Sequence, residues 1–291
     1  MDQRAHETED AHAAAVRALD SWRDAVTGKA RKVLPFPWKE LNATLGGMPL
    51  GKLLFFGGRS SEYKTTTLRT IAEYLAGLGH RSVYWTLEDS NEDIAARTIA
   101  NVVKLTTRDL GAGAYNGRDR LDQAEADRIY NEAIARIAHA PWRDNLRLID
   151  EAMPRLSRVL ELMHAEAKLG AKFFALDYFQ LVMPDRGEKS EQSVRHACAS
   201  LAGFAKETGT VVAASSQIDK AGTLESQNDC RVPKAAEMLY GTVLFQTAHG
   251  VLMLGASTNQ LEIFVEKFKS GPKGVRMHLG VDPAYDRLDE I

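Results

Sequence analysis

The sequence predicts an α/β fold: a mostly parallel β-sheet with helices on both faces and an antiparallel edge at its C-terminal end. First, from Phe36 onward, short apolar runs typical of strands alternate with helical patterns, as they do in parallel sheets. Second, the last three apolar runs follow one another without long helices between them. Third, the strand at 53–56 leads through a glycine-opened loop into Lys64 and Thr65 at the start of a helix, the layout of a phosphate-binding loop.

The composition allows one large α/β domain, or such a domain with a small appendage. The chain has 291 residues, of which 44% are hydrophobic and 26% charged, and its formal net charge is −2. This balance gives no whole-protein signal for nucleic acid, so any such site must be local. Cys198 and Cys230 lie far apart without metal-ligand spacing and are expected to be reduced thiols. The polar start, and apolar runs all shorter than the roughly 20 residues of a membrane span, predict a cytoplasmic protein without a membrane partner.

Residues 1–32 are predicted to form a helix and a linker that precede the core domain at 33–291. The helix is expected over 7–27, and Gly28 ends it. Its apolar residues form one narrow stripe: Ala15, Leu19, Trp22 and Val26. A basic, proline-bearing connector follows at 29–37. Two interpretations are open: the helix packs on its own domain, or it docks on a neighbouring subunit.

The elements of the core follow from apolar periodicity. The helix at 66–78 has one apolar face, formed by Leu68, Ile71, Leu75 and Leu78. Ser90 has the side chain of an N-cap for the next helix, and the Gly-rich segment 106–120 is expected to be irregular. The other predicted helices span residues 91–105, 122–138, 155–169 and 188–208. The predicted strands span residues 53–56, 82–87, 146–149, 172–176, 211–215, 250–254, 261–267 and 275–279.

The phosphate-binding loop departs from the usual G-x-x-x-x-G-K-[ST] pattern. Tyr63 stands where the second glycine belongs, and a Cβ there takes room that the backbone needs to approach phosphates. Glu62 adds a negative charge beside a site for anions. Taken alone, the segment is either a nucleotide loop or an ordinary strand–turn–helix junction. The residues predicted to bind nucleotide are Gly58, Arg59, Ser60, Ser61, Glu62, Tyr63, Lys64, Thr65 and Thr66.

Polar residues follow the neighbouring strands at the edge where ligands bind to open parallel sheets. Glu88 follows the strand at 82–87, Asp177 follows 172–176, and Gln217 comes shortly after 211–215. An Asp in this place can hold magnesium beside a phosphate loop. A Glu can accept the proton of an attacking water, and a Gln can sense the γ-phosphate. Strand-end acids are usually solvated caps, so the prediction rests on their occurring together.

These segments resemble the RecA-type motor domain of the DnaB replicative helicases. The resemblance is carried by LPFPWKELNATLGGMPLGKLLFFGGRSSEYKTT, VYWTLEDSNEDIAARTIA, FFALDYFQLV, VVAASSQIDK and FVEKFKSGPKGVRMHLGVDPAYDRLDE. It covers residues 33–291 and implies a RecA-like P-loop NTPase core. The helix at 7–27 sits where the family has a linker helix that docks on the next subunit. The family's globular N-terminal domain is not expected.

The resemblance implies ATP and Mg²⁺ as ligands and a role for each matching residue. Lys64 and Thr65 would bind triphosphate and metal, and Asp177 would hold the metal through water. Glu88 would be the general base, and Gln217 would link the γ-phosphate to DNA loops. Lys267 and Lys269 would reach across a subunit interface to the neighbour's nucleotide, where a cation stabilises the transition state.

Two further departures from the family's sequence weigh against efficient hydrolysis and against DNA contact. Lys269 stands where the family has an arginine finger, and lysine lacks the planar fork that grips phosphate in a bidentate manner. The segment 231–249 follows the family's DNA-facing sequence only loosely. The predicted DNA loops are 184–195 and 219–234. Their candidate phosphate-binding cations are Arg186, Lys189, Arg231 and Lys234, each of which is otherwise a solvated loop charge.

Two functions are therefore weighed. The first is an ATP-dependent DNA helicase or translocase of the hexameric ring type, acting on single-stranded DNA during replication, with a primase or helicase loader as a further partner. The second is a RecA-fold DNA-binding or recombination accessory protein that binds nucleotide and assembles but hydrolyses poorly. Intact Lys64, Thr65, Glu88, Asp177 and Gln217 favour the first; Glu62, Tyr63 and Lys269 favour the second.

Overall fold

A computed structural model describes residues 10–27, 32–115, 121–218, 232–257 and 259–291. Its centre is a nine-stranded sheet with the order β11-β10-β9-β8-β3-β7-β6-β4-β5. The strands of this sheet are β3 (Lys52–Gly58), β4 (Ser82–Thr86), β5 (Leu146–Asp150), β6 (Phe173–Asp177), β7 (Val211–Gln217), β8 (Gly250–Ala256), β9 (Gln260–Phe268), β10 (Val275–Asp282) and β11 (Arg287–Glu290). A separate pair is formed by β1 (Val33–Leu34) and β2 (Met48–Pro49).

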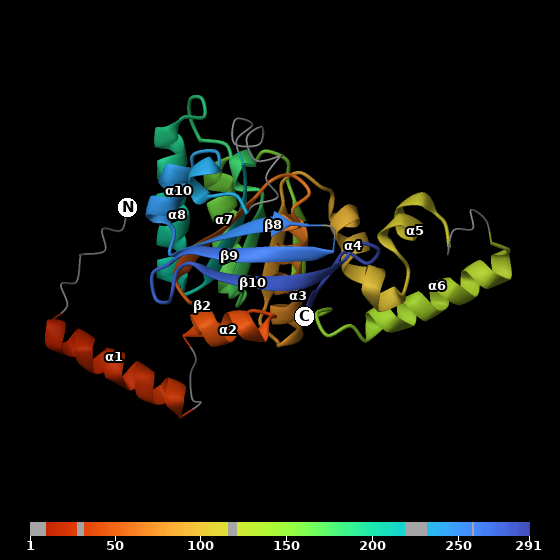
Figure 1. Cartoon of the computed structure of the whole chain (residues 1–291), viewed down its shortest axis with the longest axis horizontal. Coiled ribbons are helices and arrows are strands. Elements are labelled where there is room, and N and C mark those ends of the chain that lie inside the picture. The colour runs from red at the N-terminus through yellow and green to blue at the C-terminus, as the bar shows by residue number, and fades with distance from the viewer. Residues whose placement is uncertain (1–9, 28–31, 116–120, 219–231, 258) are drawn as a thin grey trace.

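Helices cover both faces of this sheet (Figure 1). The α-helices are α1 (Ala11–Val26), α2 (Lys39–Leu45), α3 (Lys64–Gly77), α4 (Asn91–Val103), α5 (Thr107–Ala112), α6 (Gln123–Ala138), α7 (Leu156–Lys168), α8 (Glu191–Thr208) and α10 (Gly241–Thr247). Within the described ranges there are also two 3₁₀ turns, η1 (Phe179–Leu181) and η2 (Ala235–Glu237). None of the described helices is both long and apolar enough to cross a bilayer.

The sheet has the predicted mixed character. The strands from β8 through β3, β7, β6 and β4 to β5 pair in parallel, whereas β8–β9, β9–β10 and β10–β11 pair antiparallel. Both faces are covered, which explains the unbroken apolar run of β3. Leu53 and Phe55 pack into the cluster under α7, α8 and α10, whereas Leu54 and Phe56 pack into the opposite cluster with α2 and α3.

Short elements account for most differences from the sequence-based expectations. α2, α5, α10 and β11 had no predicted counterpart, and α5 lies in the segment expected to be irregular. The sequence contains the capping box that starts this helix. The Thr106 side chain accepts the Asp109 N–H, and the Asp109 side chain accepts the Thr106 N–H. α8 begins three residues later than predicted, because Ser190 is its N-cap. Cys198 is buried on this helix, whereas Cys230 lies outside the described residues.

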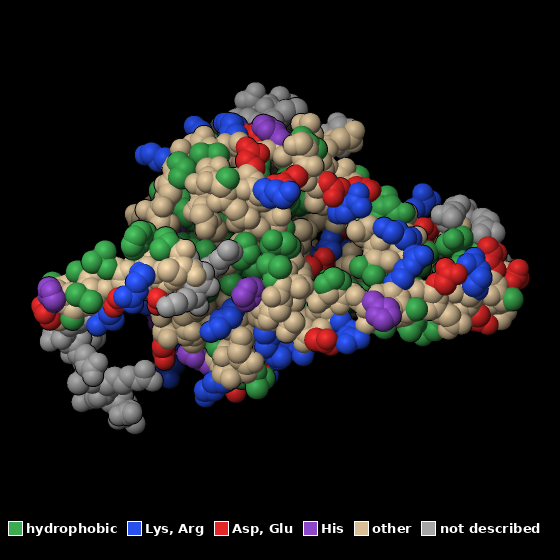
Figure 2. Space-filling view, turned by 90° about the horizontal axis from the view of Figure 1, so that it is seen from below, with side chains coloured by type: hydrophobic (Ala, Val, Ile, Leu, Met, Phe, Trp, Pro, Cys, Tyr) green, Lys and Arg blue, Asp and Glu red, His purple; other side chains and the backbone are tan. Residues whose placement is uncertain are grey.

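Two helical parts stand clear of the compact body at opposite ends of the view (Figure 1). α1 carries its apolar stripe in the open: Leu19 is 67% and Trp22 64% exposed. Figure 2 shows hydrophobic side chains at the α1 end and intermixed cations and anions over the rest of that face. At the other end α5 and α6 project from the body, and α6 has no buried residue among those described.

Candidate functional site

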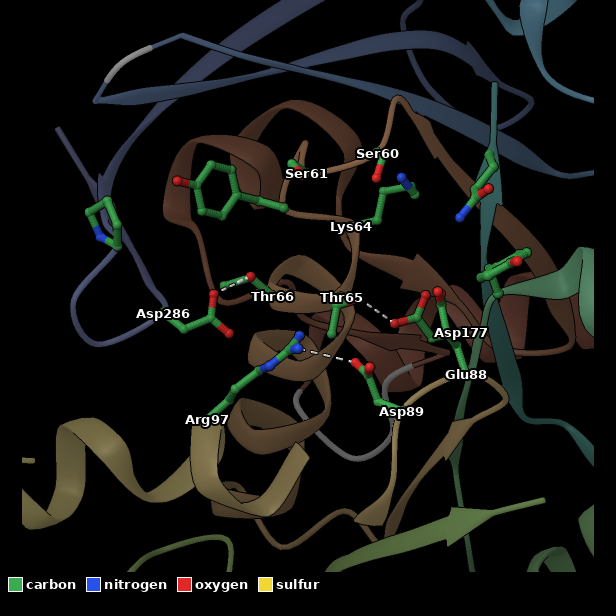
Figure 3. Close-up of a pocket in the computed structure, with 14 residues that line it drawn as sticks. Ser60, Ser61, Lys64, Thr65, Thr66, Glu88, Asp89, Arg97, Asp177 and Asp286 are labelled. Carbon is green, nitrogen blue, oxygen red and sulfur yellow. Dashed lines mark hydrogen bonds and ion pairs between the residues drawn. The ribbon is translucent and has the colours of Figure 1, made fainter. Parts of the chain in front are cut away.

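An open cavity of about 450 Å³ lies at the carboxyl ends of the parallel strands. Clefts for small molecules measure roughly 300–1,000 Å³, so a nucleotide fits this volume. The cavity is lined by Ser60, Ser61, Tyr63, Lys64, Thr65, Thr66, Glu88, Asp89, Arg97, Asp177, Tyr178, Gln217, Pro283 and Asp286 (Figure 3). Of the residues predicted to bind nucleotide, the structure brings six to this cavity. Gly58, Arg59 and Glu62 are outside its lining.

In the loop between β3 and α3, Tyr63 adopts a backbone conformation that favours the glycine it replaces. Tyr63 is in the left-handed region, with φ 54° and ψ 27°, and α3 begins at the next residue. The Tyr63 carbonyl accepts the Thr67 N–H at 2.8 Å and the Thr67 hydroxyl at 2.7 Å. A side chain in this conformation costs roughly 1–2 kcal/mol, which the first turn of α3 must offset. The tyrosine therefore takes up a backbone conformation open to glycine and brings an aromatic ring to the cavity wall.

Glu62 does not present its charge to the cavity. Its side chain is buried, and its carboxylate accepts the Arg59 backbone N–H and pairs with the Arg59 guanidinium at 2.7 Å. The pair ties the two halves of the loop together across its base. Glu62 thus stabilises the loop, and its charge is neutralised within the loop before any anion binds.

Lys64 and the first turn of α3 supply the positive end of the site. The Lys64 ammonium is largely buried and donates to the Arg59 carbonyl. Burial lowers the pKa of this ammonium, whereas the nearby carboxylates of Asp177, Glu62 and Glu88 act in the opposite direction. The N-terminus of α3 adds backbone N–H groups and the positive end of its dipole. A phosphate chain beside Lys64 would meet both sources of positive potential.

Thr65 and Asp177 place two hard oxygen donors side by side. The Thr65 hydroxyl donates to Asp177 Oδ2 at 2.6 Å, and the Tyr84 hydroxyl donates to the same oxygen at 2.7 Å. The Ser215 hydroxyl donates to Asp177 Oδ1, so donors from α3, β4 and β7 fix this carboxylate at the end of β6. Mg²⁺ prefers such oxygens and is usually bound by one or two carboxylates together with substrate phosphates. Within the described residues no cluster of three or more acids, histidines or cysteines could hold a metal ion.

Glu88 faces this pair from the end of β4. Desolvation at the cavity wall raises the pKa of the Glu88 carboxyl, and the neighbouring acids Asp89 and Asp177 add to the effect. A raised pKa suits a carboxylate that takes a proton from water. Asp89, which the sequence analysis did not single out, pairs with Arg97 at 3.2 Å and lines the same wall.

The comparisons with known proteins show the family of the chain. Residues 34–290 match the model of the DnaB-like helicase C-terminal domain. The chain belongs to this family. Among solved structures, one of an ATPase domain superposes with a TM-score of 0.81 at 19% identity, covering 97% of this chain and 100% of that one. A DnaB-like replicative helicase solved for its interactions with primase gives 0.79 at 18% identity, covering 98% and 68%. No curated protein sequence matched.

The fold of this DnaB-like domain is accordingly that of the RecA-like ATPase domains of these helicases. One wall of its cavity comes from the C-terminal turn, which contributes Pro283 and Asp286. Asp286 accepts the Thr66 hydroxyl at 2.5 Å and lies 3.3 Å from a guanidinium nitrogen of Arg69. Buried Arg69 also pairs with Glu73 at 2.5 Å. Arg69 lies off the predicted apolar face of Leu68, Ile71, Leu75 and Leu78, so the apolar pattern did not mark it.

Lys267 and Lys269 lie at the end of the sheet opposite the cavity, where the parallel strands begin. Because β9 runs antiparallel to β8, its end lies beside the start of β8, where Gly250 pairs with Phe268. Lys269 is exposed and neither lysine lines the cavity. The Lys267 ammonium donates to the Phe245 carbonyl and lies 4.9 Å from that ring's centroid. A role toward a neighbouring subunit stays a prediction; a role in the chain's own cavity is excluded by this position.

The candidate DNA-binding cations differ in their exposure and in their hydrogen bonds. Arg186 and Lys234 are exposed on their segments, and Arg231 lies outside the described residues. Lys189 requires a correction. Its ammonium donates to the carbonyls of Gln180 and of Val182, the latter at 2.8 Å, and burial lowers its pKa to about 8. The group is committed to holding the backbone, so it does not offer a free charge to DNA phosphates.

Proposed function

We propose that this chain is an ATP-hydrolysing motor that moves along single-stranded DNA as part of a DnaB-like hexameric ring. The observation that carries the proposal is the convergence of Lys64, Thr65, Glu88, Asp177 and Gln217 on one cavity. Membership of the helicase family supports the reaction class. Glu62, which weighed against hydrolysis, is paired with Arg59 away from the cavity, and Tyr63 retains the glycine-like backbone of the loop.

In this proposal each group acts on a stated part of ATP hydrolysis. Lys64 and the α3 N-terminus hold the β- and γ-phosphates. Thr65 and Asp177 would hold Mg²⁺, which neutralises charge on the transferring phosphoryl group when bound. Glu88 accepts the proton of the attacking water, with a pKa raised toward that task. Gln217, at the end of β7, lines the cavity and would contact the γ-phosphate.

Assembly completes the site. We propose that α1 docks on the neighbouring subunit through its exposed stripe of Leu19, Trp22 and Val26. Buried apolar side chains of this size each contribute roughly 1.5–3 kcal/mol, enough to hold a tethered helix. The same ring contact would bring Lys269 of one subunit toward the cavity of the next. Residues 1–32 thus act as the docking segment and 33–291 as the ATPase domain.

DNA would pass the loops that carry Arg186, Arg231 and Lys234. Contacts of this kind bind phosphates without reading bases. One chain has a net charge of −2 and so carries no overall positive charge. The positive potentials of the loops from several subunits would add in a central channel. One structural neighbour was solved for its interactions with primase, so a primase, together with a helicase loader, is the first protein partner to test.

Steady-state ATP hydrolysis with and without single-stranded DNA tests the proposal, with Glu88→Gln beside the unaltered protein. DNA-stimulated turnover that the variant abolishes is expected. Asp93→Asn is the matched control, because Asp93 is an acid of the following helix that caps it through Ser90 and does not line the cavity. The competing function is a RecA-fold accessory protein, favoured by Tyr63 at the loop and Lys269 in place of arginine. Nucleotide binding without turnover in either protein would establish that alternative.

A further inference from the structure

Gln180 connects the nucleotide cavity to the loop before α8. It lies in η1, directly after the strand that ends at Asp177, and its side chain is buried. Its amide nitrogen donates to the Ser216 hydroxyl at 2.6 Å and to the Gln217 carbonyl at 3.3 Å. Its amide oxygen accepts the Gln217 N–H at 3.3 Å. The Gln180 amide therefore grips both backbone groups of Gln217, the residue proposed to meet the γ-phosphate.

The backbone of the same residue holds the loop. The Gln180 carbonyl accepts the ammonium of Lys189, which also donates to the Val182 carbonyl at 2.8 Å. Lys189 lines a small cavity together with Phe179, Val182 and Val194. Lys189 thus fastens the C-terminal end of the segment 182–189 to η1.

The other end of this segment is fastened to α7. Met183 exchanges backbone hydrogen bonds with Pro154 at 2.8 Å and Leu156 at 2.9 Å. The Asp185 carboxylate accepts the Ser157 N–H at 3.0 Å. Between the two anchors, residues 186–188 are exposed, and Gly187 has a positive φ of 71°. Only this short tip, which carries Arg186, is left to meet a ligand.

We propose that Gln180 is a positioning residue that transmits nucleotide occupancy at Gln217 to the loop tip at 186–188. This inference rests on the proposed function, because it assigns the tip to DNA. A shift of Gln217 toward a γ-phosphate moves both backbone groups that Gln180 holds, so Gln180 shifts with it. Lys189 follows, because its ammonium is bonded to the Gln180 carbonyl. These contacts require an amide at position 180, because one side chain must donate to two oxygens and accept one N–H.

A purely structural role would also explain why the buried Gln180 amide bonds to the end of β7. The two roles differ in one readout: only coupling makes the exchange of loop amides depend on nucleotide. Gln180→Met keeps the side-chain volume and removes the grip on Gln217. Lys189→Met leaves that grip and removes the bond to the loop, at a half-buried site where folding is less at risk. Matched controls are Gln192→Met and Lys206→Met, two exposed positions on α8.

Hydrogen–deuterium exchange of the full chain tests the inference, with the magnesium complex of a non-hydrolysable ATP analogue as ligand. In the unaltered protein and both controls, the analogue is expected to slow exchange over 182–190. Gln180→Met and Lys189→Met should still bind the analogue but lose this protection. Maximal stimulation of turnover by single-stranded DNA should fall about tenfold in both variants, within the usual range for coupling between sites.

Three results would overturn the inference. Analogue binding without a change at 182–190 in the unaltered protein removes the coupling while leaving the proposed function intact. Full protection in both Gln180→Met and Lys189→Met assigns Gln180 a structural role only. Failure of the unaltered protein to bind the analogue defeats the proposed function itself, and the inference falls with it.

Discussion

The Thr65 hydroxyl donates to the Asp177 carboxylate at 2.6 Å, across 112 residues of sequence. The contact joins the first turn of α3 to the end of β6, at the point where a metal ion between loop and strand would need both oxygens. Asp177→Asn keeps the volume and a hydrogen-bond acceptor but removes the charge. We expect turnover to fall by about 100-fold or more, as when one stabilising group is lost from an active site, in a variant whose circular dichroism spectrum shows that it still folds.

Magnesium titration of turnover measures this effect directly. The control is Asp185→Asn, a carboxylate that caps α7 on the neighbouring loop and lies outside the cavity. Turnover in Asp177→Asn that saturates at the same magnesium concentration as the unaltered protein would contradict the assignment of the metal to this pair.

The Arg59–Glu62 pair is expected to matter for stability. Glu62→Ala leaves the Arg59 N–H and guanidinium without the carboxylate that the buried loop supplies. Losing hydrogen bonds to a charged, largely buried acceptor costs about 1.5–3 kcal/mol, which urea unfolding can measure. Glu161→Ala is the matched control: it breaks another three-residue-spaced pair, with Arg158 at 3.0 Å, whose acid is 69% exposed. That change should cost less than about 0.5 kcal/mol. Equal losses in the two variants would show that the loop pair is no more than a surface contact.

Tyr63 is expected to limit nucleotide affinity without preventing binding. Tyr63→Gly removes the left-handed strain and lets phosphates approach the backbone. We expect the nucleotide to bind about tenfold more tightly, a gain of roughly 1.4 kcal/mol, as measured by fluorescence titration. Tyr63→Phe, which keeps the ring and the Cβ, is the control and should bind as the unaltered protein does. Weaker binding by Tyr63→Gly would mean that the ring itself contacts the nucleotide.

Much of this site was accessible from the sequence because parallel strands bring their carboxyl ends to one edge. Lys64, Thr65, Glu88, Asp177 and Gln217 lie at or beyond strand ends, so the strand pattern and the family resemblance together predict that they meet. The role of Lys189 was not accessible in this way. A lysine in a polar loop reads as a solvated charge, and only tertiary packing reveals the two carbonyls that bind it. Glu62 was misjudged for the same reason, since only the folded loop turns its carboxylate away from the cavity and onto Arg59.

His249 should make the fold sensitive to mild acid. Burial, with Lys52, Lys269 and Lys267 nearby, lowers the pKa of its imidazole from 6.5 to about 4. The unfolded chain therefore binds the extra proton first, so the free energy of unfolding should fall as pH drops from 6.5 toward 4. Since the ring is partly exposed, we expect a loss of about 1 kcal/mol after screening. Urea unfolding at pH 7 and pH 5 measures it, and His249→Gln should lose less over the same interval. An equal pH dependence in both proteins would assign the acid sensitivity to other groups.

Lys269 and Glu88 are expected to act in the same reaction from different subunits. Lys269 lies at the edge of the sheet away from its own cavity, so a chain with Lys269→Ala keeps an intact cavity and lacks the cation for its neighbour. Glu88→Gln is the reverse case. Each variant alone should lose about 100-fold in turnover. Mixed rings contain interfaces with an unaltered Glu88 on one side and an unaltered Lys269 on the other, so mixing should restore part of the activity.

The measurement is turnover of each variant alone and of an equimolar mixture after reassembly. A mixture of Glu88→Gln with Lys64→Ala is the control, because both changes lie in the same cavity and every cavity of the mixed ring then carries one of them. Restoration by the first mixture and none by the second would place Lys269 in the neighbour's reaction. Full activity of Lys269→Ala alone would remove this lysine from the mechanism, since hydrolysis would then proceed without any cation supplied from this position.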